Sequence, residues 1–317
     1  MRDHGGNLDA AQARFGGTGW IDLSTGINRV PYPLPPIPAE AWTALPTASA
    51  SRAFIEVAQA AYGTTAPLLP LAGAQAAIQL IPRLAPPGRA RVLAPTYNEH
   101  AAALRAAGWT VDEVATAADL PGADLAVVVN PNNPDGQVHA PDDLVALAGK
   151  VGRLVVDESF ADPVPHLSVA EAAGERLLVL RSFGKFYGLA GLRLGCVIAG
   201  SDTTAALAAM AGPWAVSGPA LAVGTVALAD RGWQTATAAR LATDAQRLDD
   251  LARAAGWPLV GGTALFRLYD TPDAAAAQDG LARRAIWSRI FPWSARWLRL
   301  GLPGAASEWD RLARALR

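Results

Sequence analysis

The chain has 317 residues, 51% of them hydrophobic and 17% charged, so it can bury a large core and is not intrinsically disordered. Its net charge of −1 gives no reason to expect nucleic acid or an anionic membrane surface as a partner. A single cysteine, Cys196, excludes an internal disulfide framework and fits a reducing cytoplasm. With one cysteine and four scattered histidines, no metal site is expected. The N-terminus lacks the apolar core of a signal peptide, and no apolar run approaches the roughly eighteen residues of a membrane helix.

Residues 1–40 are expected to form an irregular arm with one short strand at residues 20–24, because prolines crowd residues 31–38. An arm of this length is usually functional or packs on a neighbouring part of the protein. Residues 48–62 then have the apolar spacing of a helix, with Phe54 and Ala58 on one side.

From about residue 66, short apolar strands alternate with helical patterns. Strands are expected at residues 68–71, 91–94, 110–114, 125–129, 153–157, 176–181 and 196–199. Helices are expected at residues 76–84, 98–107 and 141–151. This alternation predicts an α/β fold with a mostly parallel sheet flanked by helices, in which ligands bind beyond the carboxyl ends of the strands. One crevice would then hold the residues at the strand ends: Gly73, Tyr97, Asn133, Asp157 and Lys185.

The remainder of the chain predicts a smaller α+β domain. Helices are expected at residues 202–210, 219–254 with a break near Gly232, 274–284 and 307–316. Strands are expected at residues 258–260, 265–268 and 297–300. We therefore divide the chain into an N-terminal arm (1–40) that joins the small domain and the active site, a large cofactor-binding domain (41–215) and a small C-terminal domain (216–317).

The glycine-rich loop between the strands at 176–181 and 196–199 carries an informative lysine. The chain has 27 lysines and arginines, yet lysine occurs only at positions 150 and 185. An arginine stays protonated and cannot form a Schiff base, whereas a lysine amine can. A solvated basic loop is the alternative, but it leaves the glycines and the apolar flanks unexplained.

Together these residues outline a site for pyridoxal 5'-phosphate. Lys185 would bind the cofactor aldehyde, and Asp157 would pair with the protonated pyridine nitrogen. Asn133, held between prolines, would contact the ring hydroxyl, and Tyr97 would lie against the ring face. On its own, Asp157 would more simply be part of an acidic turn after a strand.

The cofactor phosphate would bind at the start of a helix, beside two polar side chains. Ser182 and Arg193 supply the side chains, while backbone N–H groups at Gly73, Ala74 and Gln75 favour an anion at the helix N-terminus. The glycine spacing between Gly188 and Gly195 superficially resembles a dinucleotide-binding loop but does not match that fingerprint.

Three motifs in this order resemble the class I/II aminotransferases of pyridoxal-phosphate fold type I. They are Asn-Pro-Asn-Asn-Pro-x-Gly at 130–136, Asp-Glu-Ser-Phe at 157–160, and Ser-Phe-Gly-Lys at 182–185 followed by Arg193. The resemblance implies a homodimer with the site at the interface and a cis peptide bond at Asn133-Pro134.

The two ends of the chain are similar to the threonine-phosphate decarboxylases of cobalamin biosynthesis. The matching segments are residues 4–7, 23–28, 212–216 and 297–300. The resemblance implies that L-threonine O-3-phosphate loses CO2 to give (R)-1-amino-2-propanol O-2-phosphate. It also implies that Arg299 binds the substrate carboxylate, and that His4, Asn28 and Arg311 gather the substrate phosphate.

Three positions depart from the common aminotransferase pattern. Phe160 stands where many members have a tyrosine, and the decarboxylase branch resembles this chain in carrying phenylalanine there. Asp135 replaces a threonine. Leu45 replaces a tyrosine that reaches the neighbouring subunit's cofactor phosphate, so this cross-subunit contact is not predicted. Two alternatives stay open: a histidinol-phosphate or related amino-acid aminotransferase, and a catalytically silent homologue with a binding role.

Overall fold

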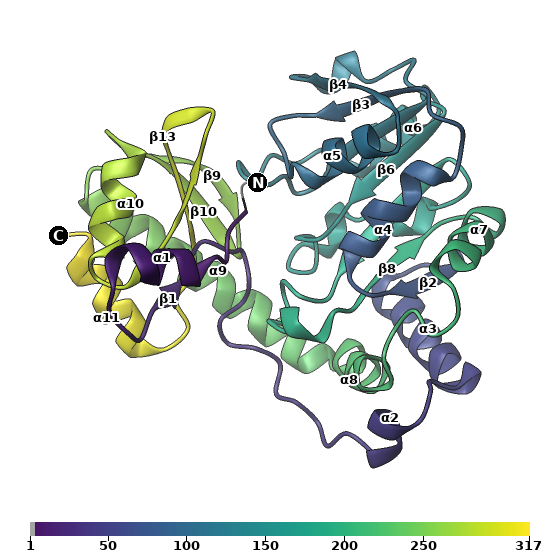
Figure 1. The fold of residues 1–317 in the computed structure, drawn as a ribbon, viewed down its shortest axis with the longest axis horizontal. Helices are drawn as coiled ribbons and strands as arrows, with labels where there is room; N and C mark the ends of the chain where they lie inside the picture. The colour runs from purple at the N-terminus through teal and green to yellow at the C-terminus, as the bar shows by residue number, and fades with distance from the viewer. Residues whose placement is uncertain (1–3) are drawn as a thin grey trace. The chain divides into compact units, whose positions relative to one another are not determined.

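The computed structural model describes residues 4–317 and contains two compact units (Figure 1). The larger unit comprises residues 32–133 and 138–234. The smaller unit comprises the described residues up to Pro31, the segment Pro134–Gln137, and residues 235–317. Among the residues described, no helix is both long enough and apolar enough to span a bilayer.

The larger unit is built on a seven-stranded sheet with the order β2-β8-β7-β6-β5-β3-β4. Its strands are β2 (Leu68–Leu71), β3 (Arg89–Leu93), β4 (Thr110–Val114), β5 (Leu125–Val129), β6 (Arg153–Asp157), β7 (Leu177–Ser182) and β8 (Gly195–Ile198). All pairings are parallel except those of β8, which runs antiparallel to both β2 and β7. The mostly parallel sheet predicted from the sequence is confirmed.

Helices of the larger unit pack against this sheet and against each other. They are α2 (Ala39–Thr43), α3 (Ala48–Tyr62), α4 (Ala74–Leu80), α5 (Glu99–Ala106), α6 (Pro141–Ala148), α7 (Ser201–Ala211) and α8 (Gly218–Ala229). The helix predicted at 48–62 is confirmed: Thr47 caps its N-terminus by accepting a hydrogen bond from the Ala50 amide, and Gly63 ends it in the left-handed conformation.

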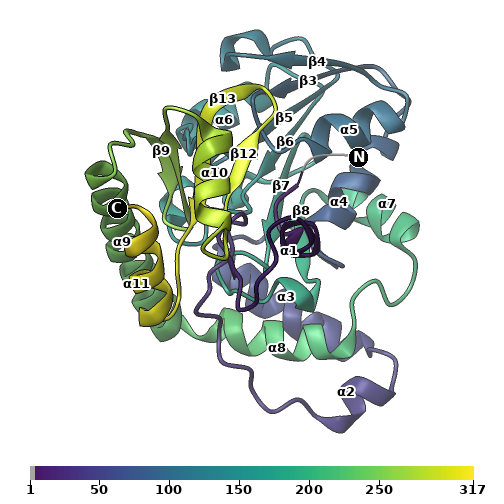
Figure 2. The ribbon, with the colours of Figure 1, turned by 60° about the vertical axis from the view of Figure 1, so that its left-hand side comes forward.

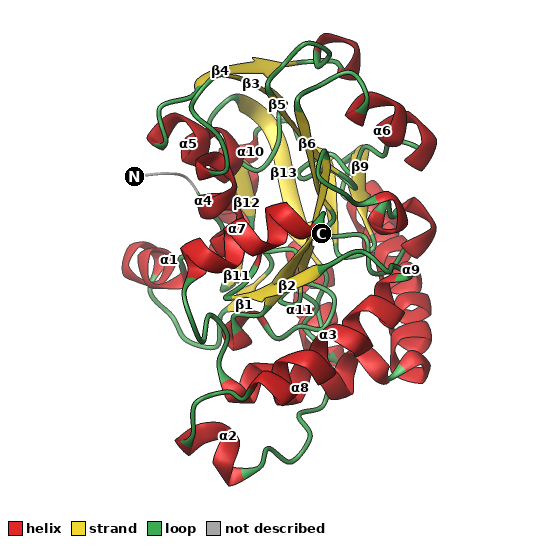
Figure 3. Ribbon diagram, turned by 90° about the vertical axis from the view of Figure 1, so that its right-hand side faces the viewer, coloured by secondary structure: helices red, strands yellow, loops and turns green. Residues whose placement is uncertain are grey.

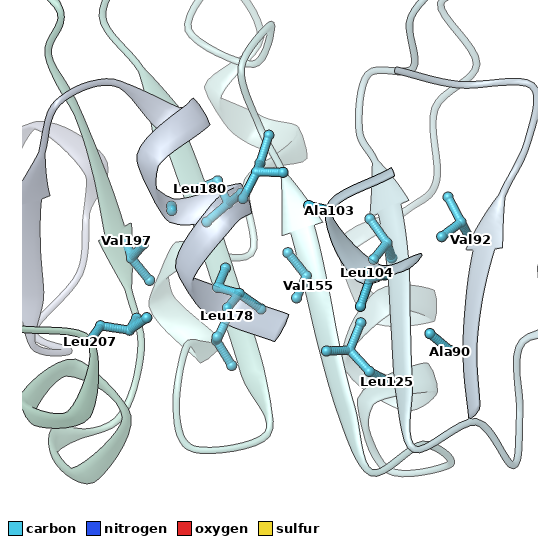
Figure 4. Close-up of a cluster of buried hydrophobic side chains, with 14 of the residues drawn as sticks. Ala90, Val92, Ala103, Leu104, Leu125, Val155, Leu178, Leu180, Val197 and Leu207 are labelled. Carbon is cyan, nitrogen blue, oxygen red and sulfur yellow. The ribbon is translucent and has the colours of Figure 1, made fainter. Parts of the chain in front are cut away.

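One core of the larger unit lies between the sheet and the helices α4, α5 and α7. Alternate residues of the strands point into it, such as Leu125 of β5 and Leu178 of β7, because successive strand residues face opposite sides (Figure 4). Leu104 of α5 and Leu207 of α7 close the core from the helical side. Every residue of β5 is buried, as expected for a strand covered on both faces.

The smaller unit contains a four-stranded antiparallel sheet with the order β12-β13-β10-β9. Its strands are β9 (Leu259–Thr263), β10 (Phe266–Asp270), β12 (Arg289–Phe291) and β13 (Ser294–Gly301). A separate parallel pair joins β1 (Ile21–Asp22) to β11 (Ile286–Trp287). Helix α10 (Ala274–Ala282) packs on β12 and β13 (Figure 2). The other helices are α1 (Leu8–Phe15), α11 (Ala306–Ala315) and the part of α9 (Arg231–Ala254) from Thr235 onward.

Several local details differ from the sequence-based expectations. The N-terminal arm is not irregular throughout, because Leu8–Phe15 forms α1, which Asn7 caps by accepting a hydrogen bond from the Ala10 amide. The predicted break near Gly232 in the long helix is confirmed at Asp230, whose carboxylate caps the next helix by accepting from the Trp233 amide. Strands β11 and β12 were not predicted.

The expected cis peptide bond at Asn133-Pro134 is wrong. The described cis bonds are Ala94-Pro95 and Asn130-Pro131, the second of which opens the same asparagine-proline loop. The division of the chain into an arm, a cofactor domain and a small domain by function stays a prediction.

Candidate active site

A cavity of about 170 Å³ opens at the carboxyl ends of β5, β6 and β7 in the larger unit. Asp157 is the last residue of β6 and Ser182 the last of β7, so the parallel sheet brings them to one edge. Every residue that the sequence analysis assigned to the cofactor lines this cavity: Gly73, Ala74, Gln75, Tyr97, Asn133, Asp157, Ser182, Lys185 and Arg193.

The carboxylate of Asp157 is buried and held by two neighbours. His100 of α5 lies with its Nε2 atom 2.9 Å from Asp157 Oδ2, and Ser159 donates to Oδ1 from both its hydroxyl and its amide. Burial acts to raise the pKa of Asp157, but the hydrogen bond and charge of His100, together with Ser159, outweigh it and hold the pKa below its usual value. Asp157 is therefore a carboxylate that can face a cationic group. The sequence analysis did not assign His100 to this site.

The N-terminus of α4 and the side chain of Arg193 form an anion cradle. Gly73 caps α4 with a φ of 83°, and a Cβ atom added there would lie 2.7 Å from Arg193 Nη2. A Cβ atom at Gly195 would lie 2.5 Å from the Ala74 nitrogen. Arg193 itself has a left-handed backbone, with φ 52°. Glycine is thus required for the guanidinium to approach the helix N-terminus, where backbone N–H groups favour an anion.

Lys185 stands in the turn after β7, on the same cavity wall as Phe160. The Lys185 Nζ atom lies 5.7 Å from the centre of the Phe160 ring, which is buried. Phe160 offers no hydroxyl group to the cavity, whereas Asn133 is a polar side chain there that can contact a ring hydroxyl. The hydroxyl of Tyr97, which also lines the cavity, lies 3.2 Å from Gln75 Oε1.

Arg299 of β13, predicted as a substrate ligand, lies in the smaller unit and is 6% exposed. Its Nη2 atom donates to the Ser24 carbonyl at 2.7 Å, and its guanidinium lies over the ring of Phe266. Arg289 of β12 stands directly opposite Arg299 in the antiparallel pair. Burial, and then the charge of Arg289, lower the pKa of Arg299 to about 9.

Two guanidinium groups this close repel each other, and an anion bound by both would offset that repulsion. Arg289 is therefore a candidate ligand that the sequence analysis missed. No signal in the sequence pointed to it, because Arg289 lies on β12, a strand of three residues that is too short to show an alternating pattern.

The other predicted substrate residues also belong to the smaller unit. His4 precedes the Gly5-Gly6 segment, whose Gly6 amide donates to the Ser24 hydroxyl, beside the carbonyl that accepts from Arg299. Asn28 is buried, and its Oδ1 atom accepts from the Val30 amide and from Arg240 Nη2. Arg311 of α11 donates to the Gly19 carbonyl at 2.6 Å. Their roles toward a substrate stay predictions.

Two of the departures from the aminotransferase pattern have clear surroundings. Leu45 is 62% exposed in the larger unit. Asp135 belongs to the smaller unit, where its Oδ1 atom accepts a hydrogen bond from the Gln137 amide and so closes a local turn.

The model of the family "Aminotransferase class I and II" matches residues 40–316. The chain belongs to this family. It is 46% identical to a threonine-phosphate decarboxylase of Pseudomonas aeruginosa, covering 100% of this chain and 97% of that protein. It is 45% identical to a threonine-phosphate decarboxylase of a Sinorhizobium species, covering 99% and 97%. The resemblance read from the three motifs is confirmed.

The fold is similar to that of histidinol-phosphate aminotransferase from Sinorhizobium meliloti, solved with pyridoxal 5'-phosphate. The TM-score is 0.82, and the match covers 97% of this chain and 92% of that one. At 20% identity, this likeness supports the fold. The predicted class, an α/β large domain with a second, smaller sheet as in pyridoxal-phosphate fold type I, is confirmed.

Proposed function

We propose that this protein is a pyridoxal-phosphate-dependent carboxy-lyase that converts L-threonine O-3-phosphate to (R)-1-amino-2-propanol O-2-phosphate in cobalamin biosynthesis. The observation that carries the proposal is the cavity in which Lys185, Asp157 and the anion cradle at Gly73 and Arg193 face one space. Support for the substrate comes from the 46% identity, along nearly the full length of both chains, to a protein named threonine-phosphate decarboxylase.

The cofactor of the family is pyridoxal 5'-phosphate, and the cavity fits its chemical groups. The glycine at position 73 lets the Arg193 guanidinium approach the α4 N-terminus, where a Cβ atom would intrude, so both groups can face a phosphate in the cavity. The buried carboxylate of Asp157 suits the protonated pyridine nitrogen, Lys185 suits the aldehyde, and Asn133 suits the ring hydroxyl. When bound, the cofactor draws electron density away from the substrate Cα atom.

The residues of this chain would decide which bond at Cα breaks. A decarboxylase must hold the carboxylate bond perpendicular to the cofactor ring, whereas an aminotransferase holds the Cα–H bond there. We assign the two substrate anions to different groups: the carboxylate to Arg299, and the phosphate to His4, Asn28 and Arg311 with Arg289 as an addition. Loss of CO2 leaves an electron pair at Cα, and either Lys185 or a water molecule would return the proton.

The deciding experiment supplies threonine phosphate to the purified protein and measures CO2 and keto acid in parallel. The proposal expects CO2 and the amino alcohol phosphate, with no requirement for an amino acceptor. Keto acid formed only when 2-oxoglutarate is added would instead identify an aminotransferase of the histidinol-phosphate type.

Visible absorbance distinguishes the proposed enzyme from a catalytically silent homologue. The native protein should carry the absorbance of a lysine-bound pyridoxal group, and Lys185→Ala should lose it together with activity. A colourless native protein that regains no colour with added cofactor would contradict the proposed chemistry.

We further propose that the enzyme acts as a homodimer in the cytoplasm. Large apolar side chains of the larger unit are exposed, among them Trp42 at 66%, Leu45 at 62% and Trp214 at 58%. Such exposure on one chain is typical of a surface that a second copy covers. The free thiol of Cys196 fits a reducing compartment. Light scattering should give twice the chain mass, and cell fractionation should recover the protein with cytoplasmic markers.

A further inference from the structure

A chain of hydrogen bonds runs from the cavity wall to a buried carboxylate behind it. The Tyr97 hydroxyl lies 3.2 Å from Gln75 Oε1, and Gln75 Nε2 donates to Glu99 Oε2 at 3.0 Å. Tyr97 and Gln75 line the cavity, whereas Glu99 does not and is 6% exposed. Gln75 belongs to α4 and Glu99 to α5, two helices that pack side by side (Figure 3).

The Glu99 carboxylate sets the direction of both hydrogen bonds in this Tyr97–Gln75–Glu99 series. An ionised carboxylate only accepts hydrogen bonds, so the NH2 group of Gln75 must face Glu99. The carbonyl oxygen of the same amide then faces Tyr97, and the tyrosine hydroxyl must donate to it. Glu99 lies in the first turn of α5, where the helix N-terminus favours a negative charge.

We propose that Glu99 is a positioning residue that acts through Gln75 to fix the hydroxyl and ring of Tyr97 at the cavity wall. This inference rests on the proposed function, because the group that the Tyr97 ring would cover is the pyridine ring of the cofactor. It adds a residue outside the cavity to the machinery that orients the cofactor.

The N-terminus of α5 favours a carboxylate at position 99 but does not by itself set which end of the Gln75 amide faces Tyr97. Burying a carboxylate is costly, and Glu99 is held by Gln75 of α4, the helix whose N-terminus would bind the cofactor phosphate. A glutamine at position 99 would bind Gln75 without that charge. Two facing amides, however, can pair in either sense, and one of these turns an NH2 group toward Tyr97. The charge makes the bond pattern unique.

The test measures cofactor binding rather than turnover. Glu99→Gln should raise the dissociation constant of the apoprotein for pyridoxal 5'-phosphate roughly tenfold, the lower end of the value of a hydrogen bond to a charged group. It should also weaken the visible circular dichroism of the bound cofactor, which reports how the ring is held. Glu113→Gln is the matched control, because Glu113 is exposed on β4 and pairs with Arg105. Its binding should equal that of the native protein.

A double-mutant cycle with Tyr97→Phe decides whether Glu99 acts through the hydroxyl. In the Tyr97→Phe background, Glu99→Gln should cause no further loss of binding or dichroism. An equal loss in both backgrounds, or no loss in the native background, overturns the inference. If Glu99→Gln does not fold, Gln75→Met removes the same two hydrogen bonds. Its effect on cofactor binding and dichroism must likewise vanish in the Tyr97→Phe background. A native protein that binds no pyridoxal 5'-phosphate would instead refute the proposed function.

Discussion

The substitution Gly73→Ala tests the anion cradle directly. The new Cβ atom would lie 2.7 Å from Arg193 Nη2 and 3.2 Å from Arg193 Cζ, so the guanidinium must move away from the α4 N-terminus. An alanine at φ 83° and ψ 162°, a region that essentially only glycine adopts, also carries a backbone penalty of about 1–3 kcal/mol. Losing a charge-assisted hydrogen bond to the cofactor phosphate is worth about 1.5–3 kcal/mol, or roughly a tenfold to hundredfold weaker binding.

Gly122→Ala separates backbone strain from the clash with Arg193. Gly122 has φ 84°, almost the same as Gly73, but a Cβ atom there meets nothing within 4 Å. Both variants should lose free energy of unfolding in urea as apoproteins, because both place an alanine at a positive φ. Only Gly73→Ala should bind pyridoxal 5'-phosphate more weakly in a titration of the apoprotein. If the two variants bind the cofactor equally well, the anion cradle is misassigned.

Two further predictions concern charges at the two candidate sites. His100→Asn should raise the pKa of Asp157, which His100 helps hold below 3.8 in the folded protein. The ionised carboxylate stabilises the fold above pH 3.8, and this stability is lost as the pH falls through the folded pKa. The variant should therefore lose this stability at a higher pH than the native protein. Urea unfolding between pH 3 and 6 measures this loss of stability. If the pH dependence of the unfolding free energy is the same in both proteins, His100 is not what lowers the pKa of Asp157. Arg289→Gln should raise the KM for threonine phosphate roughly tenfold to hundredfold while leaving cofactor binding unchanged; unchanged steady-state kinetics would remove Arg289 from the substrate site.

Local sequence signals were sufficient for the architecture of the larger unit. The continuous apolar run at residues 125–129 predicted a strand, and β5 has these bounds with every residue buried. Apolar periodicity predicted the helix at 48–62 for the same reason, because it depends on neighbours within a few positions. Helix α1 was missed because its alanine-rich, polar sequence has little apolar periodicity.

Contacts between distant residues were beyond such signals. His100 and Asp157 are 57 positions apart, and Gln75 and Glu99 are 24 apart. Neither pair carries a spacing that marks it in the chain. Arg289 and Arg299 face each other only because the short strand β12 pairs with β13 in one register, and a shift of one residue would turn their side chains to opposite faces.

The sequence by itself determined the succession of strands and helices in the larger unit. It also determined the identity of the lysine, aspartate and asparagine at or just after the strand ends, because apolar pattern and residue chemistry are properties of short segments. Only the tertiary structure decided what surrounds those groups: the histidine that keeps Asp157 charged, the missing Cβ atom that admits Arg193, and the carboxylate behind Gln75. These depend on packing distances of a few ångströms between segments that fold together, which no local pattern encodes.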